Sequence, residues 1–191
     1  MVSFSKFLSM EEYITKKTLP FVVFSHGKES GPYGKKIQRL IAVAEGLGLS
    51  TLSVDYRNCT NAEERVFLLG QTIASLDVPS QQVVLVGSSM GGYVSMVVAN
   101  EQPVAGLFLM APALWMPVEE YTVQTYHPKT TSIEITHGLQ DDIVPHENSV
   151  RFVCECSNAI LHLVPDDHRL KTSHDFLAYQ FKGFIDVIKQ S

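Results

Sequence analysis

Residues 87–92 read GSSMGG and contain the pattern G-x-S-x-G. An apolar run precedes this segment and an apolar-periodic run follows it, which predicts a turn between a strand and a helix. Such a sharp turn exposes a serine hydroxyl, and the flanking glycines avoid steric clashes around it. We therefore interpret Ser89 as a nucleophile, with Ser88 as the less favoured neighbour. The backbone N–H of Met90 would then point to where an oxyanion forms. The alternative is a turn that only connects two elements or binds a phosphate through its amides.

A serine hydroxyl is a weak nucleophile unless a base removes its proton, so a histidine oriented by a carboxylate is expected further along the chain. Asp141 and Asp142 follow the apolar run SIEITH, and His168 follows the run ILHLVP. Aspartates also fill turns and cap helices, and most histidines are surface polar residues. The order serine, aspartate, histidine, with each residue at the end of its own strand, favours a Ser-His-Asp triad.

The remaining histidines have other interpretations. His26 and His137 each precede a glycine at a predicted strand end, where a hydrogen bond that stabilises the turn is favoured over proton transfer. His174 opens the last predicted helix and is the alternative base. The chain lacks the H-E-x-x-H and Cys-His spacings of zinc sites. We expect neither a metal nor an organic cofactor.

The elements that must position these residues follow from alternating apolar runs and amphipathic segments. The runs are nearly all apolar, as in parallel strands covered on both faces. We predict strands at residues 21–27, 51–56, 81–87, 106–113, 132–138 and 159–165, and helices at 34–48, from about 63, after 89, at 146–156 and from 174. The alternation predicts the α/β class: a doubly wound, mostly parallel sheet of about six strands with helices on both faces.

Residues 114–131 show no clear periodicity and contain several aromatic side chains. A segment of this length without periodicity inside a compact domain is commonly functional, and its aromatic content favours order over an apolar surface. We interpret it as a candidate short lid, with Trp115, Met116 and Tyr121 lining a substrate pocket. The alternative is that these side chains only cover an edge of the core.

The composition excludes several classes of protein. The 191 residues carry Lys+Arg 15 and Asp+Glu 20, a net charge of −5, without a basic tract longer than a pair, which argues against nucleic-acid or anionic-membrane binding. We predict one domain over 1–191, with 1–20 as an N-terminal lead. The three cysteines lack the spacing of a disulfide framework. No apolar run is long enough for the core of a signal peptide or for a membrane span. A reduced compartment, the cytoplasm, is expected.

From Phe21 onward the chain resembles a small serine α/β-hydrolase of the compact, esterase-like kind that has little or no cap domain. The resemblance rests on SHG at 25–27, on GSSMGG, and on HGLQDDIVP at 137–145 followed by DDH. It implies the α/β-hydrolase fold and a second oxyanion-hole amide just after the His-Gly turn, which here is the N–H of Lys28. It also implies that the acid is the aspartate four residues before the proline, Asp141 rather than Asp142.

Together these observations predict a serine hydrolase that cleaves carboxylic esters of small or medium apolar acyl groups through an acyl-enzyme on Ser89. The expected partner is a small-molecule ester or thioester. The same apparatus would serve a thioesterase or an acyltransferase. A non-catalytic protein-binding module on the same scaffold is the alternative from another class. Neither the physiological substrate nor the oligomeric state follows from the sequence.

Overall fold

The computed structural model describes residues 19–59 and 61–190. Six parallel strands form one sheet in the order β2-β1-β3-β4-β5-β6. The α/β class and the strand number predicted from the sequence are confirmed. The strands are β1 (Phe21–Ser25), β2 (Thr51–Val54), β3 (Val83–Ser88), β4 (Gly106–Met110), β5 (Ile133–Gly138) and β6 (Ala159–Val164).

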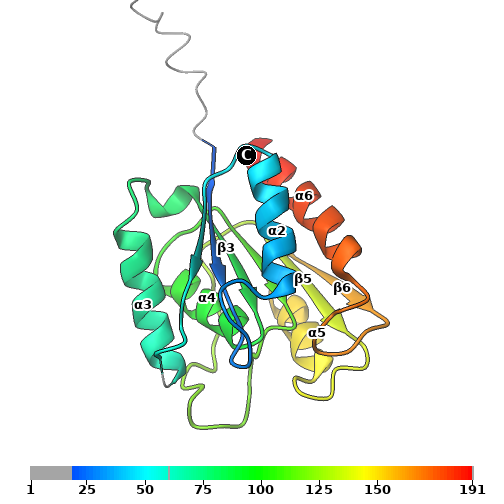
Figure 1. The fold of residues 1–191 in the computed structure, drawn as a ribbon. Helices are drawn as coiled ribbons and strands as arrows, with labels where there is room; N and C mark the ends of the chain where they lie inside the picture. Colours follow the sequence, from blue (N-terminus) through cyan, green and yellow to red (C-terminus); the bar gives the residue numbers. More distant parts are fainter. Residues whose placement is uncertain (1–18, 60, 191) are drawn as a thin grey trace, which may run out of the picture.

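Helices cover both faces of the sheet (Figure 1). They are α2 (Lys35–Gly46), α3 (Ala62–Ala74), α4 (Met90–Glu101), α5 (His146–Glu155) and α6 (His174–Gln190), with a short 3₁₀ turn η1 (Ser80–Gln82) before β3. Helices α2 and α6 share one buried apolar cluster, in which Leu40 and Phe181 join Phe108 of the sheet. Helices α3, α4 and α5 share the cluster on the opposite face, with Leu69, Val94 and Phe152.

The four central strands are buried almost throughout, as their apolar sequences predict. The two edge strands differ from that expectation. Leu52 of β2 and Ile160 of β6 are exposed by 36% and 57%. Each edge strand has a neighbour on one side only, so the helices do not enclose it fully.

Several strands end earlier than their apolar runs. β4 ends at Met110 rather than at residue 113, because Ala111 adopts a left-handed φ of 45° and Pro112 has no N–H to donate. β2 ends at Val54 because the side chain of Asp55 accepts a hydrogen bond from the N–H of Arg57 and turns the chain. Both strands end early at the carboxyl-terminal end of the sheet, where the candidate site lies.

Of the N-terminal lead predicted for residues 1–20, the part up to residue 18 lies outside the described residues. Within the described ranges, none of the helices has the length and apolar character needed to cross a bilayer.

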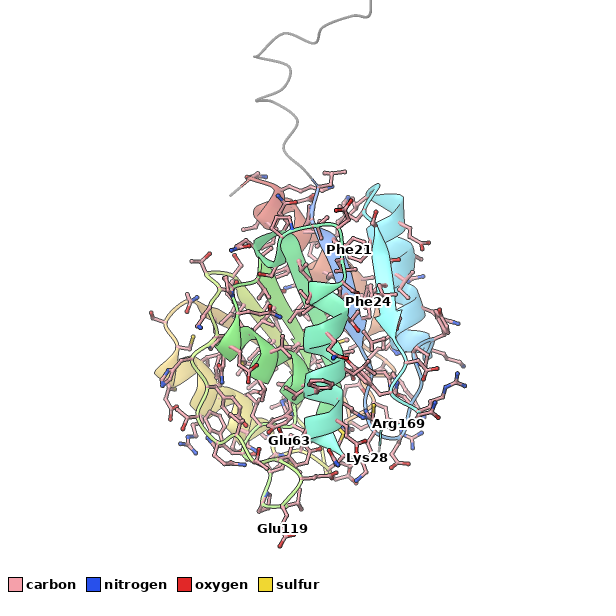
Figure 2. The ribbon with its side chains drawn as sticks, turned by 90° about the vertical axis from the view of Figure 1, so that its left-hand side faces the viewer. Phe21, Phe24, Lys28, Glu63, Glu119 and Arg169 are labelled. Carbon is pink, nitrogen blue, oxygen red and sulfur yellow. The ribbon has the colours of Figure 1, made fainter. Side chains whose placement is uncertain are left out.

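The parallel register brings the carboxyl ends of the central strands to one edge of the sheet. Gly87 of β3 is level with Ser25 of β1, and Ser88 is level with Met110 of β4. Figure 2 shows Phe21 near the opposite edge and Lys28 and Arg169 together at this edge. Loops that follow β1, β3, β5 and β6 therefore converge there.

Candidate active site

Ser89 occupies a strained turn between β3 and α4. Its backbone has φ 55° and ψ −122°, a conformation that non-glycine residues rarely adopt. Its N–H donates to the carbonyl of Met110, and its carbonyl accepts from the N–H of Ala113. A Cβ on Gly87 would come within 2.5 Å of the Gly91 carbonyl oxygen, so the turn requires glycine there. The neighbouring loops thus hold Ser89 in place.

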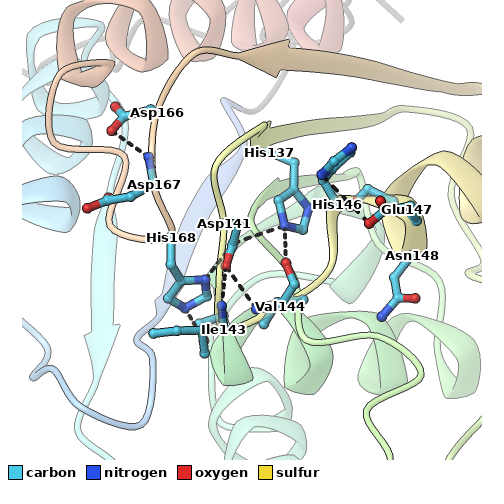
Figure 3. Close-up of polar contacts among 12 residues, drawn as sticks. His137, Asp141, Ile143, Val144, His146, Glu147, Asn148, Asp166, Asp167 and His168 are labelled. Carbon is cyan, nitrogen blue, oxygen red and sulfur yellow. Dashed lines mark hydrogen bonds and ion pairs between the residues drawn. The ribbon is translucent and has the colours of Figure 1, made fainter.

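The side chains of Ser89, His168 and Asp141 form one continuous hydrogen-bonded chain. Figure 3 shows His168 beside Asp141, with His137 on the other side of the carboxylate. His168 Nε2 lies 2.9 Å from Ser89 Oγ, and His168 Nδ1 lies 2.7 Å from Asp141 Oδ2. Asp142 is exposed, and among the described residues it has no hydrogen bond to His168. His174, the alternative base, begins α6 and is not part of this chain of contacts.

The side chain of Asp141 is fully buried and surrounded by donors. Oδ1 accepts hydrogen bonds from the N–H groups of Ile143 and Val144, and Oδ2 accepts from both His168 and His137. Burial alone would raise the pKa of Asp141, but the hydrogen bonds from His137, His168 and the two amides outweigh burial and lower this pKa overall. Asp141 is therefore an anion held in a fixed orientation.

The loop that carries His168 is held by Asp166, whose role the sequence did not indicate. Oδ2 of Asp166 accepts from the N–H and hydroxyl groups of Thr172 and Ser173 at 2.8–2.9 Å, and Oδ1 accepts from the N–H of Asp167. Burial raises the pKa of Asp166, but these donors outweigh it and lower the pKa overall. The only sequence signal is the pair of hydroxyl residues six and seven positions later.

The turn after β1 packs directly against Ser89. A Cβ on Gly27 would lie 3.2 Å from Ser89 Cβ, so the peptide that leads to Lys28 borders the serine. His26 holds this turn: its Nε2 accepts from the N–H of Tyr56 and its Nδ1 donates to the Gly27 carbonyl. Burial lowers the pKa of His26, in keeping with a neutral ring. His26 therefore makes the hydrogen bonds within the turn that the sequence favoured.

The two amides considered for an oxyanion hole, Met90 N–H and Lys28 N–H, have no hydrogen-bond acceptor among the described residues. Met90 opens α4, where first-turn N–H groups have no partner within the helix. The side chain of Lys28 points elsewhere, to a salt bridge with Glu120 at 2.9 Å. The oxyanion role of both amides stays a prediction.

Residues 111–132 contain neither helix nor strand, and their aromatic side chains are mostly packed. Tyr121 is 8% exposed and meets Tyr93 of α4 with ring centroids 4.8 Å apart. Trp115 lies edge-on to Tyr126 and beneath the guanidinium of Arg151 at 4.1 Å.

Trp115 and Met116 are half-buried. In the described part of the chain, the side chains of Trp115, Met116 and Tyr121 have no hydrogen bond to the triad. The segment is tied to Ser89 through the backbone of Ala113. The roles of residues 114–131 as a lid and of these three side chains as a pocket stay predictions.

A cavity of about 450 Å³ lies at the opposite edge of the sheet, lined among others by Leu19, Gln82, Val104 and Ile188. It is therefore not a substrate pocket for Ser89. Over residues 19–59 and 61–190, His, Cys, Asp and Glu side chains do not gather in groups of three or more that could hold a metal ion.

Comparisons with known proteins find similarity at the level of structure. Neither a protein-family model nor a curated protein matches the chain. A structure from Xanthomonas campestris pv. campestris, described as a hydrolase of the alpha/beta superfamily, aligns with TM-score 0.76 and 27% identity over 88% of this chain and 99% of its own. Est1E from Butyrivibrio proteoclasticus aligns with TM-score 0.75 and 17% identity over 94% and 92% of the two chains. Alpha/beta hydrolase domain-containing protein 10 from mouse aligns with TM-score 0.68 and 20% identity over 88% and 90%.

Proposed function

From the α/β-hydrolase fold of this chain we propose that it is a serine hydrolase that cleaves carboxylic esters of small or medium apolar acyl groups through an acyl-enzyme on Ser89. The observation that carries the proposal is the hydrogen-bonded chain from Ser89 through His168 to Asp141, at 2.9 and 2.7 Å. A packing role alone would not require three polar side chains from three separate loops to meet at a strained turn.

In the proposed reaction His168 Nε2 accepts the proton of Ser89 Oγ while the oxygen attacks the acyl carbon. The resulting imidazolium then donates this proton to the leaving alkoxide, which departs as the alcohol. Asp141 keeps the proton of the neutral ring on Nδ1 and stabilises the cation. Water, deprotonated by His168, then attacks the acyl-enzyme, and the proton returns to Ser89 as the acid leaves.

The tetrahedral intermediate carries a negative oxygen, for which the proposal assigns the N–H groups of Met90 and Lys28. Both amides lack an acceptor among the described residues, and both border Ser89 in sequence or in space. Donors that are already in place stabilise the developing charge without the cost of reorganising water.

The preference for apolar acyl groups rests on the surroundings of the triad. Leu139 and Ile143, in the turn that carries Asp141, are exposed by 44% and 56%. The loop that follows β4 starts beside Ser89 and brings the half-buried Trp115 and Met116. We assign Trp115, Met116 and Tyr121 to the wall of the acyl pocket and residues 114–131 to a short lid. The cytoplasm remains the proposed location.

A graded substrate panel tests this function. The rate constant kcat/KM is measured for p-nitrophenyl esters of two to twelve carbons and for acyl-CoA thioesters of the same lengths, with Ser89→Ala as the matched control. We expect hydrolysis of the shorter esters with a burst of p-nitrophenol equal to the enzyme concentration. A higher kcat/KM for the acyl-CoA thioester than for the ester at every acyl length would indicate a thioesterase. Absence of turnover and of a burst with every substrate would contradict an enzymatic function and favour a binding module.

A further inference from the structure

His137, near the end of β5, is a second histidine in contact with Asp141 that the mechanism above does not use. Its side chain is completely buried, and both ring nitrogens have partners. Nε2 lies 3.0 Å from Asp141 Oδ2 and 3.0 Å from the carbonyl oxygen of Val144, and Nδ1 lies 2.7 Å from Ser149 Oγ on α5. The ring is therefore fixed between the turn that carries Asp141 and helix α5.

The partners determine which ring nitrogen carries the proton. A carboxylate and a carbonyl oxygen can only accept hydrogen bonds, so Nε2 of His137 is protonated and donates to Asp141 and Val144. The hydroxyl of Ser149 can donate to Nδ1, which accepts when the ring is neutral. Asp141 and Val144 therefore select the tautomer in which Nε2 of His137 donates, and Ser149 supports this tautomer by donating to Nδ1.

With this tautomer, both oxygens of Asp141 are fully occupied. Oδ1 accepts from the amides of Ile143 and Val144, and Oδ2 accepts from His168 and His137. A carboxylate offers about four lone-pair positions, so no acceptor position is left over. The carboxylate cannot rotate without losing a bond, and its charge is shared between two imidazole rings.

We propose that His137 is a positioning residue of this site: its Nε2–H fixes the Asp141 carboxylate toward His168 and moderates the basicity of His168, while Ser149 holds the His137 tautomer. The ordered contacts thus run from Ser149 through His137, Asp141 and His168 to Ser89. This inference deepens the proposed hydrolase function and rests on it for its kinetic consequences.

Other titratable groups face the same site. The ring centroid of His146, at the start of α5, lies 6.5 Å from that of His137. Lys36 on α2 interacts with the charges of Asp141 and Asp166, and burial lowers its pKa to about 8 although these carboxylates oppose the change. All of these groups are retained when His137 alone is changed, so a difference between variants reports on His137.

The direct test is the pKa of His168, measured by NMR titration of ¹⁵N-labelled histidine rings in the full chain. Without the second donor, the charge of Asp141 acts on His168 alone and stabilises its imidazolium. His137→Leu should therefore raise the pKa of His168 by about 0.5 to 1. In His137→Gln, which keeps an N–H donor, the pKa of His168 should stay closer to its wild-type value. In His137→Leu, kcat/KM for p-nitrophenyl acetate should fall about 10- to 100-fold, with the acid limb of the pH profile moved upward.

Two further variants complete the test. His146→Leu removes the neighbouring ring but no bond to Asp141, so the pKa of His168 should not change. Ser149→Ala removes only a hydroxyl, so it tests the proposal even if leucine at position 137 prevents folding. It should raise the pKa of His168 by less than His137→Leu does.

The proposal would be overturned if the pKa of His168 kept its wild-type value in every folded His137 and Ser149 variant. An equal rise of this pKa in His146→Leu would also overturn it. The titration needs no turnover, so its failure is distinct from failure of the hydrolase function, which would appear as absent ester hydrolysis in the wild type.

Discussion

Gly91, in the first turn of α4, lies so close to the end of β1 that a Cβ on it would overlap the carbonyl group of Ser25. The turn that carries Ser89 and the turn that leads to Lys28 are therefore in direct backbone contact. Gly91→Ala should force the two backbones apart, lower the free energy of unfolding by about 1–3 kcal/mol, and reduce kcat/KM for esters by about 100-fold because the reacting groups are misplaced. Urea unfolding and ester kinetics measure the two effects.

The matched control is Gly183→Ala in α6, where an added Cβ would meet nothing within 4 Å. This variant should retain full activity and gain about 0.5–1 kcal/mol, because alanine favours a helix over glycine. Equal activity in the two alanine variants would show that the contact between Gly91 and Ser25 does not shape the site.

Asp141 has a buried side chain and Asp142 is exposed, so we expect different losses of activity when each is changed to asparagine. Asp141→Asn should lower kcat about 10⁴-fold, because an amide at this position favours the wrong tautomer of His168. Asp142→Asn removes an exposed carboxylate and should change kcat less than about tenfold, equivalent to about 1.4 kcal/mol. A larger loss for Asp142→Asn than for Asp141→Asn would reverse the assignment of the acid.

His26 gives the stability of the protein a pH dependence. Burial lowers its pKa in the folded state below the ordinary value of 6.5, so the unfolded chain binds the proton more readily. Its contribution to stability is complete above pH 6.5 and is lost as the pH falls from 6.5 toward the lowered folded pKa. Protonation also places a hydrogen on Nε2, which accepts from the N–H of Tyr56 in the neutral ring.

Urea unfolding at pH 7.5 and 5.5 measures this loss. His26→Gln should be less stable than the wild type at pH 7.5 but should lose less stability on acidification. His127→Gln, at an exposed histidine, should follow the wild type. A His26→Gln protein that loses as much stability as the wild type would show that His26 is not the group responsible.

Trp115 tests the proposed acyl pocket. If its ring forms part of the wall, Trp115→Ala should move the preferred acyl chain toward longer esters, since each matching methylene contributes up to about 0.8 kcal/mol when buried. The measurement is kcat/KM over the acyl series together with thermal unfolding, with Phe67→Ala, exposed by 67% on α3, as the control. An unchanged order of substrates with a large loss of thermal stability would make Trp115 a packing residue between Tyr126 and Arg151.

The fold was largely predictable because its signals are local. The apolar run at Val83–Ser88 and the helical spacing of Leu177, Phe181 and Ile185 indicate buried elements without knowledge of their neighbours. The strand order was not predictable in this way, because the position of β1 between β2 and β3 depends on contacts distant in sequence. Strand ends were also misplaced where left-handed backbone, as at Ala111, ends an apolar run.

In the candidate site, too, local sequence signals were predictive and contacts between distant segments were not. Positions at strand ends indicated His168 and the pair Asp141 and Asp142, and the resemblance to serine hydrolases favoured Asp141. The structure brings Asp141 and His168 to Ser89, while their chemical roles stay predictions. The contacts of His137 with Ser149 on α5 and of Asp166 with Ser173 in the loop before α6 were not predicted, because a pattern of hydroxyl residues along the chain does not by itself identify their partners. His137 was expected only to stabilise its own turn, but it also contacts the carboxylate of Asp141.

The central claim is that Ser89 is the acyl carrier, and the most direct measurement is the site of covalent modification. The wild-type protein, Ser89→Ala and Ser88→Ala are treated with a fluorophosphonate probe, and the modified peptide is identified by mass spectrometry. We predict one adduct on Ser89 in the wild type and in Ser88→Ala, no adduct in Ser89→Ala, and a loss of about 10⁶ in kcat for Ser89→Ala. An adduct on Ser88, or a wild-type protein that remains unmodified, would contradict this account.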